Sequence, residues 1–170
     1  MKTLRILLAM SFSFFGLWAS AEPLDLGADA PAITATNQDG ATVDLGELYK
    51  KGLVLVYFYP KADTGGCTAQ ACSLRDEFEV LTEKGVTVVG VSTDNAPDQK
   101  AFQKKYNLPF TLIADPEAKV VDAFGVTKMG PVASRQAYLV KGGKVVWRDL
   151  KASTKQQAAD VLAALETLGE

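Results

Sequence analysis

Two stretches of the chain are apolar at nearly every position, residues 53–59 and residues 86–91. The first is bounded by Gly52 and Pro60, two residue types that commonly interrupt regular structure. A short apolar run between such breaks is typical of a strand that is buried on both faces of a sheet. Both stretches are therefore predicted to be central strands.

The segment between these two strands has the periodicity of a helix. Leu74, Phe78 and Leu81 lie three and four residues apart, which places them on one helical face, and Gly85 follows as a stop. We expect a helix over residues 72–84. Strand, helix and strand in succession form a βαβ unit, in which the two strands are parallel and the crossover is right-handed.

The rest of the pattern adds elements at both ends of this unit. Alternating segments around turn residues predict a hairpin on each side, and an amphipathic helix ends the chain. A parallel βαβ unit followed by an antiparallel ββα unit is a thioredoxin-like order. We predict one α/β domain over residues 22–170, with an N-terminal β-hairpin extension and a central mixed sheet flanked by helices. The further elements expected are strands 33–36 and 41–44, a helical turn 45–49, helices 96–106 and 117–124, strands 110–113, 136–140 and 144–149, and a helix over 154–168 capped by Ser153 or Thr154.

Residues 1–21 differ from the rest of the chain. Lys2 and Arg5 precede an uncharged apolar run, and small residues end the segment at Ala21. This pattern predicts a signal peptide that is cut before Glu22, and hence an exported, periplasmic protein with no stable membrane association after cleavage. An uncleaved membrane anchor is the alternative, but the apolar run is shorter than the ~20 residues that span a bilayer.

The composition excludes several classes of function. A chain that is 48% hydrophobic and 22% charged is ordinary for a globular protein, and a formal net charge of −2 argues against nucleic acid as a partner. The absence of His excludes Cys–His and Ser–His catalysis and removes the commonest metal ligand. Two Cys residues alone do not supply the four ligands of a structural zinc site. The composition therefore gives no support to a metal site.

Cys67 lies between a predicted buried strand and the following helix, a position that is typical of reactive residues in α/β proteins. It follows the first apolar strand after a loop that contains Gly65 and Gly66, near the start of the next helix. Ligands of open α/β sheets bind at the C-terminal ends of the strands, and the free N–H groups of a helix N-terminus stabilise a thiolate, the reactive form of cysteine. Thr64 can offer a hydroxyl group, and Arg135, at the start of a later strand, can supply a cation.

The pair formed by Cys67 and Cys72 also permits other interpretations. A structural disulfide is common in an oxidising compartment, although a loop this short gives little stabilisation. On one helix the two Cα atoms would be roughly 8.6 Å apart, whereas disulfide geometry tolerates up to ~6.8 Å. Formation of the disulfide would then require the helix to unwind locally, which suits a reversible redox switch better than a permanent structural disulfide. The alternatives are a binding module with a structural disulfide and an exported thioredoxin-fold disulfide oxidoreductase, which would be expected to carry Cys-x-x-Cys.

The residues around this pair match a known motif at several points. Pro60, Thr64 and Cys67 have the spacing Pro-x-x-x-Thr-x-x-Cys, Cys72 follows five residues after Cys67, and Arg135 precedes a Tyr-Leu-Val strand. In these features the chain resembles the peroxiredoxins, specifically the bacterioferritin-comigratory-protein or Q subfamily. The resemblance extends over most of the chain beyond residue 24.

This resemblance implies a thiol-dependent peroxidase, an atypical 2-Cys peroxiredoxin that reduces hydrogen peroxide and organic hydroperoxides. Cys67 is implied to be the peroxidatic cysteine, which becomes a sulfenic acid, and Cys72 the resolving cysteine, which closes an intramolecular disulfide. An external, thioredoxin-like dithiol would reduce this disulfide. No cofactor is needed, and a monomer is sufficient because both cysteines belong to one chain.

The family pattern also assigns roles to the residues beside the cysteine. Thr64 and Arg135 are implied to assist catalysis, and Pro60 and Gly66 to belong to the loop that binds the substrate. The subfamily usually has Pro at the position of Gly65. Because Gly has more conformational freedom than Pro, we expect a less preorganised loop in this chain.

Overall fold

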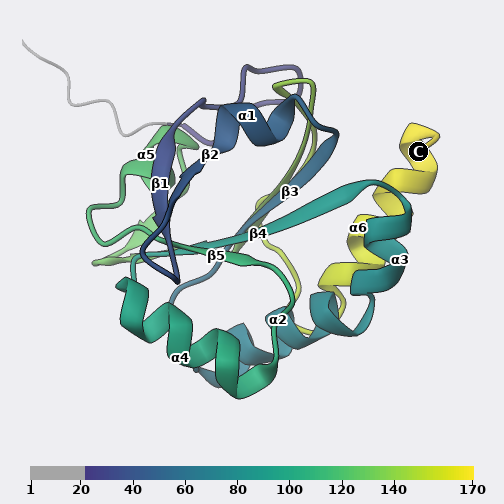
Figure 1. The fold of residues 1–170 in the computed structure, drawn as a ribbon. Coiled ribbons are helices and arrows are strands. Elements are labelled where there is room, and N and C mark those ends of the chain that lie inside the picture. The colour runs from purple at the N-terminus through teal and green to yellow at the C-terminus, as the bar shows by residue number, and fades with distance from the viewer. Residues whose placement is uncertain (1–21) are drawn as a thin grey trace, which may run out of the picture.

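The computed structural model describes residues 22–170, which form a seven-stranded mixed sheet and a separate two-stranded ribbon (Figure 1). The strands are β1 (Thr34–Asn37), β2 (Thr42–Asp44), β3 (Leu53–Phe58), β4 (Val86–Ser92), β5 (Thr111–Ala114), β6 (Lys128–Met129), β7 (Val132–Ala133), β8 (Gln136–Lys141) and β9 (Lys144–Asp149). The sheet has the order β2-β1-β5-β4-β3-β8-β9, and β6 pairs with β7. The three central strands, β5, β4 and β3, are parallel, and every other neighbouring pair is antiparallel.

Helices cover both faces of this sheet. In this part of the chain they are α1 (Leu45–Tyr49), α2 (Gly65–Asp76), α3 (Phe78–Glu83), α4 (Ala96–Tyr106), α5 (Lys119–Ala123) and α6 (Gln157–Leu168). Successive side chains of a strand point to opposite faces, so Leu55 and Tyr57 of β3 belong to a core with α2, α3, α4 and α6, and Val54 and Val56 to a core with α1 and α5. Figure 1 shows α2 and α4 on one side of the sheet and α1 and α5 on the other.

The two central strands predicted from the apolar runs are confirmed as β3 and β4. They pair in parallel from Leu53 opposite Val86 to Phe58 opposite Val91, and all six residues of β3 are buried. The N-terminal hairpin, the C-terminal hairpin and the final helix are also present. The predicted thioredoxin-like fold, with a hairpin extension and a mixed sheet between helices, is therefore confirmed.

The helix predicted over residues 72–84 is wrong in its bounds. Two helices, α2 and α3, occupy this region and meet at Glu77, whose φ of −104° and ψ of 15° depart from the α-helix. The first helix begins at Gly65 rather than at Cys72. As a consequence, Cys67 and Cys72 lie on the same helix.

Most other boundaries agree with the prediction to within one residue, and the larger differences lie at the starts of α5 and α6. β5 begins at Thr111, one residue later than expected. α5 begins at Lys119, because the carboxylate of Asp115 accepts backbone N–H groups from its first turn at 2.8–2.9 Å. α6 begins at Gln157 rather than at residue 154, and its N-cap is Gln156, so the predicted cap by Ser153 or Thr154 is wrong. The hydroxyl of Ser153 instead accepts the N–H groups of Lys155 and Gln156 in the turn before the helix.

The predicted signal peptide, residues 1–21, lies outside the described residues. Within residues 22–170, no helix combines the length and the apolar character that crossing a membrane requires. The ribbon of β6 and β7 was not predicted, because each strand has only two residues. This ribbon leads directly into β8 and thereby fixes the segment that carries Arg135.

Candidate active site

Cys67 lies at the C-terminal end of β3, in the first turn of α2. The connection, residues 60–64, is called the cysteine loop below. The first helical hydrogen bond runs from the N–H of Thr68 to the carbonyl of Thr64 at 2.8 Å, and the Thr64 side chain makes no capping bond. The N–H groups of Gly66 and Cys67 therefore have no intrahelical partner, and they create a local positive potential beside the sulfur. Cys67 itself is only 2% exposed.

Arg135 supplies the cation that the sequence led us to expect. Its Nη2 lies 3.4 Å from the Sγ of Cys67, although the two residues are 68 positions apart. The register of the sheet explains this approach, because β8 pairs antiparallel with β3 and places Gln136 opposite Phe58, at the strand end from which the cysteine loop departs. A guanidinium at this distance can donate to the sulfur and stabilise negative charge on it.

Gly66 makes room for this guanidinium. A Cβ atom at position 66 would lie 3.2 Å from Nη2 of Arg135 and 3.3 Å from Cγ2 of Thr154, which is closer than almost all Cβ contacts in proteins. Gly65, by contrast, faces open space, and neither glycine has a positive φ. A larger residue at position 66 would therefore have to displace Arg135 or Thr154 slightly, whereas one at position 65 would displace neither.

Thr64 does not take the position expected for a partner of the thiolate. Its side chain is exposed, and its hydroxyl donates to the carbonyl of Lys61 at 3.0 Å, so it closes the cysteine loop instead of contacting sulfur. Pro60 is half-buried and lies two residues after the end of β3, where it has no N–H group with which to continue the sheet. In this conformation both residues shape the loop.

The cysteine loop is anchored by residues that the sequence analysis did not identify. Asp63 adopts a left-handed conformation, with φ of 57°, and its carboxylate accepts hydrogen bonds from Lys105 at 2.7 Å and from the hydroxyl of Tyr106 at 2.6 Å. These bonds, with that from Lys105 contributing most, lower the pKa of Asp63 below its ordinary value of 3.8. One residue earlier, the N–H of Ala62 donates to the carboxylate of Asp94 at 2.7 Å.

Cys72 lies on α2 one and a half turns after Cys67, and it is half-buried. Both cysteines are free thiols. Five helical residues separate their Cα atoms by roughly 8.6 Å, so a disulfide requires the start of α2 to unwind. Beyond this segment, Arg75 donates to the carbonyl of Tyr106 at 2.9 Å and holds the last turn of α2 against the end of α4.

Two buried glutamines complete the surroundings of Arg135. Gln70 accepts a hydrogen bond from Nη1 of Arg135 and donates from Nε2 to Oε1 of Gln157 at 2.8 Å. Both glutamines are fully buried. Gln70 could have been found from the sequence, because it lies three residues after Cys67 and so on the same helical face. Nothing in the sequence pattern indicates Gln157.

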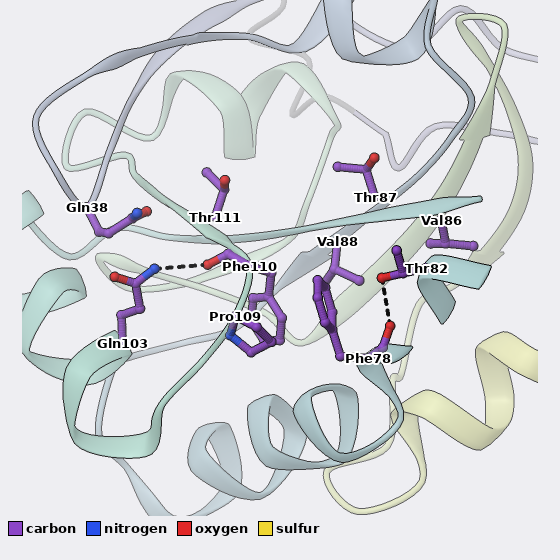
Figure 2. Close-up of a pocket in the computed structure, with 10 residues that line it drawn as sticks. All are labelled: Gln38, Phe78, Thr82, Val86, Thr87, Val88, Gln103, Pro109, Phe110 and Thr111. Carbon is purple, nitrogen blue, oxygen red and sulfur yellow. Dashed lines mark hydrogen bonds between the residues drawn. The ribbon is translucent and has the colours of Figure 1, made fainter. Parts of the chain in front are cut away.

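A separate pocket of about 360 Å³ opens between α3, α4 and the beginnings of β4 and β5 (Figure 2). Figure 2 shows Phe78 and Phe110 side by side among the residues that line it. Nε2 of Gln103 donates to the carbonyl of Phe110 at 3.2 Å. Its lining includes neither Cys67 nor Arg135. The pocket lies at the N-terminal ends of the parallel strands, and the cysteine lies beyond a C-terminal end.

The described residues contain no group of three or more His, Cys, Asp or Glu side chains that could hold a metal ion. The groups that the fold brings together around Cys67 are its buried sulfur, the guanidinium of Arg135 and backbone N–H groups at the start of α2. Groups of this kind, at the start of a helix on a thioredoxin-like fold, are suited to thiol chemistry.

Comparison with known proteins gives the family. The AhpC/TSA family matches residues 26–148, and the chain belongs to this family, with its relatives among the peroxiredoxins of the Q and bcp type. It is 43% identical over 122 residues to the chloroplastic peroxiredoxin Q of rice, a match that covers 71% of this chain and 56% of the rice protein. It is 42% identical over 103 residues to peroxiredoxin bcp of Coxiella burnetii, covering 61% of this chain and 68% of that protein.

A solved structure gives the same result. The bacterioferritin comigratory protein of Xanthomonas campestris, described for its alkyl peroxide reduction activity, superimposes with a TM-score of 0.78 at 25% identity. The match covers 86% of this chain and all of that chain. By contrast, the chain spans little more than half the length of the plant relatives that it matches.

One prediction from the sequence is contradicted by these relatives. The chain was expected to be exported to the periplasm, but the plant relatives are chloroplast proteins. The expected location rested entirely on residues 1–21, which lie outside the described structure and outside the family match. The prediction of a periplasmic protein is therefore wrong.

Proposed function

We propose that this protein is a thiol-dependent peroxidase in which Cys67 reduces hydrogen peroxide and organic hydroperoxides. The observation that carries the proposal is the 3.4 Å approach of Arg135 Nη2 to the Sγ of Cys67 at the N-terminus of α2. Membership of the AhpC/TSA family supports it, as does the alkyl peroxide reduction described for the Xanthomonas relative.

The first step is nucleophilic attack by the Cys67 thiolate on the terminal oxygen of the hydroperoxide. An S–O bond forms while the O–O bond breaks, so sulfur is oxidised to a sulfenic acid and the leaving oxygen takes a proton to become water or an alcohol. Negative charge moves from sulfur to the leaving oxygen during this step. Arg135 and the N–H groups of Gly66 and Cys67 are placed to stabilise that charge, because they are already oriented before the reaction begins.

The second step joins Cys72 to Cys67. The start of α2 unwinds, the Cys72 thiolate attacks the sulfur of the sulfenic acid, and the S–O bond breaks with release of water. Gly65 and Gly66 favour this unwinding, because glycine gains more backbone freedom on leaving a helix than any other residue. An external thioredoxin-like dithiol then returns two electrons by exchange and regenerates both thiols. Since both cysteines belong to one helix, we propose that a monomer completes the cycle.

The proposal is tested by peroxide consumption combined with thiol titration. The wild-type protein should lose two thiols for each peroxide consumed in the absence of reductant, and Cys72→Ser should leave a sulfenic acid on Cys67 that a dimedone-type reagent traps. Peroxide consumption by Cys67→Ser at the wild-type rate would overturn the mechanism. Reduction of a protein disulfide without any consumption of peroxide would instead favour a thioredoxin-fold disulfide oxidoreductase.

A further inference from the structure

Four side chains form a continuous hydrogen-bonded row that ends at the reactive sulfur. Gln157, the first residue of α6, accepts from Nε2 of Gln70 at 2.8 Å, and Oε1 of Gln70 accepts from Nη1 of Arg135. The other terminal nitrogen of Arg135 reaches Sγ of Cys67 at 3.4 Å. The row therefore connects α6, α2 and the segment before β8, which are distant in sequence.

The direction of every bond in this row is determined by the chemistry of the groups. A guanidinium only donates, so the part of Gln70 that faces Arg135 must be its carbonyl oxygen. The amide NH₂ of Gln70 then points away from Arg135 and needs an acceptor, which Gln157 provides. Gln157 therefore selects the orientation of the Gln70 amide, and Gln70 in turn selects the orientation of Arg135.

The positive charge of Arg135 is not neutralised by either glutamine of this row. Arg135 takes part in none of the ion pairs formed within residues 22–170. Its polar partner at Nη1 is a neutral amide, so its positive charge is not shared with a carboxylate. Both glutamines are fully buried, and water therefore does not screen the guanidinium on that side.

We propose that Gln70 and Gln157 are positioning residues that act on Cys67 through Arg135, and that their neutrality is essential to this role. A buried arginine is ordinarily matched by a carboxylate, which attracts the guanidinium and offsets its charge. An amide pair holds the same geometry without offsetting the charge, so the full electrostatic effect of Arg135 acts on the sulfur. This inference rests on the proposed role of Cys67 in the reaction with peroxide.

Gln157 has one further feature that suits this role. Its Nε2 is buried and has no hydrogen-bond partner among the described residues. Burial of an unpaired amide donor is unfavourable to folding, so a structural explanation alone does not account for a glutamine at this position. The oxygen of the same side chain is used by Gln70, which gives the residue a reason to be present.

The test compares Gln70→Glu with Gln70→Met in a Cys72→Ser background, where Cys67 is the single thiol. Glutamate keeps the shape of the side chain and adds a charge, whereas methionine keeps the neutrality and removes the hydrogen bonds. Two rates are measured, the reaction of Cys67 with hydrogen peroxide and its alkylation by iodoacetamide as a function of pH. Gln156→Glu is the matched control, because it adds the same charge at the exposed residue next to Gln157.

Gln70→Glu is expected to move the midpoint of the alkylation profile upward by about one pH unit and to slow the peroxide reaction at pH 7 about tenfold. Gln70→Met should slow the peroxide reaction through disorder of Arg135 while moving the midpoint much less. Gln157→Glu should move the midpoint in the same direction as Gln70→Glu, by a smaller amount, and it serves as the second variant if Gln70→Glu does not fold. The control should match the parent protein in both rates.

Equal midpoints in the parent, Gln70→Glu and Gln157→Glu would overturn the inference, as would a midpoint shift in Gln70→Met as large as that in Gln70→Glu. These outcomes are distinct from a failure of the proposed function. If Cys67→Ser still consumed peroxide, the reaction would not involve Cys67, regardless of the behaviour of the glutamine variants. If Cys67→Ser were inactive and the glutamate variants were unaffected, only the role of the glutamines would be disproved.

Discussion

The carboxylate of Asp63 binds the ammonium group of Lys105 at 2.7 Å, across 42 positions of the sequence. This bond joins the cysteine loop to the C-terminal end of α4, and the hydroxyl of Tyr106 adds a second bond to the same carboxylate. The loop before Cys67 is followed at position 65 by glycine, which does not restrict the backbone as proline would. It is held instead by contacts made at a distance.

Asp63→Asn should lower the stability of the reduced protein at neutral pH and slow its reaction with peroxide. The hydrogen bonds from Lys105 and Tyr106 lower the pKa of Asp63 in the folded protein below its ordinary value of 3.8. Their contribution to stability is therefore present above that pH and is lost as the pH falls through the lower, folded pKa. Thermal unfolding at pH 7 should separate the variant from the wild type, and at pH 2 the two melting temperatures should converge.

Asp39→Asn is the control for this prediction. Asp39 pairs with Lys100, also on α4, at 2.6 Å, and this bond likewise lowers the pKa of Asp39. Its loss should affect stability in a similar way without changing the rate with peroxide, because Asp39 does not touch the cysteine loop. Equal loss of activity in both variants would contradict a specific role for the Asp63 bond.

Gly65→Pro should stabilise the reduced protein by about 0.4–1 kcal/mol, which corresponds to about 1–4 °C in melting temperature. Gly65 is the first residue of α2, the helical position at which proline is preferred because its missing N–H is not needed there. The preceding Thr64 is already extended, with φ of −95° and ψ of 152°, as a residue before proline must be. Calorimetry of the reduced form checks the expectation, and a lower melting temperature would disprove it.

Gly66→Ala should slow the reaction with peroxide, whereas Gly65→Ala should leave its rate nearly unchanged. The added methyl group at position 66 meets Arg135 at 3.2 Å and Thr154 at 3.3 Å, so the guanidinium has to move away from sulfur. The methyl group at position 65 meets nothing within 4 Å. Stopped-flow measurement of both variants gives the comparison, and similar rates for the two would show that the contact is unimportant.

Arg135→Met should reduce the rate constant for peroxide about 100-fold, the loss typical of removing one oriented donor from a charged transition state. Arg135→Lys should recover only part of this rate. The planar guanidinium contacts both Gln70 and the sulfur through two nitrogens, whereas the single nitrogen of an ammonium group does not replace both contacts. Melting temperatures should be measured in parallel. A wild-type rate in Arg135→Met would remove the basis for the proposed stabilisation of charge.

The parts of this molecule that sequence could predict are those determined by local periodicity. The apolar runs of β3 and β4 gave their identity as buried strands, because a strand that is covered on both faces has no polar alternation. The division between α2 and α3 at Glu77 was missed, since neither Gly nor Pro marks it. The position of Cys67 at a helix start followed from its place after β3.

The surroundings of the cysteine could be predicted only in part. Arg135 was expected through the family motif, which also led us to expect a role for Thr64 that the observed hydroxyl geometry does not display. The bond between Gln70 and Gln157 joins residues 87 positions apart, and no local pattern encodes such a contact. It arises from the packing of α2 on α6, which is a property of the whole fold.

Tyr106 contacts both ends of the segment that contains the two cysteines, through its hydroxyl to Asp63 and through its carbonyl to Arg75. In the proposed mechanism, the stretch that unwinds and refolds in each turnover is therefore held at both ends. Because both ends stay in place, the start of α2 can re-form without refolding of the domain. Closure of a chain of about ten residues takes on the order of 10–100 ns. We therefore expect that re-formation of the helix does not limit turnover, whose rate is set by encounters with peroxide and reductant.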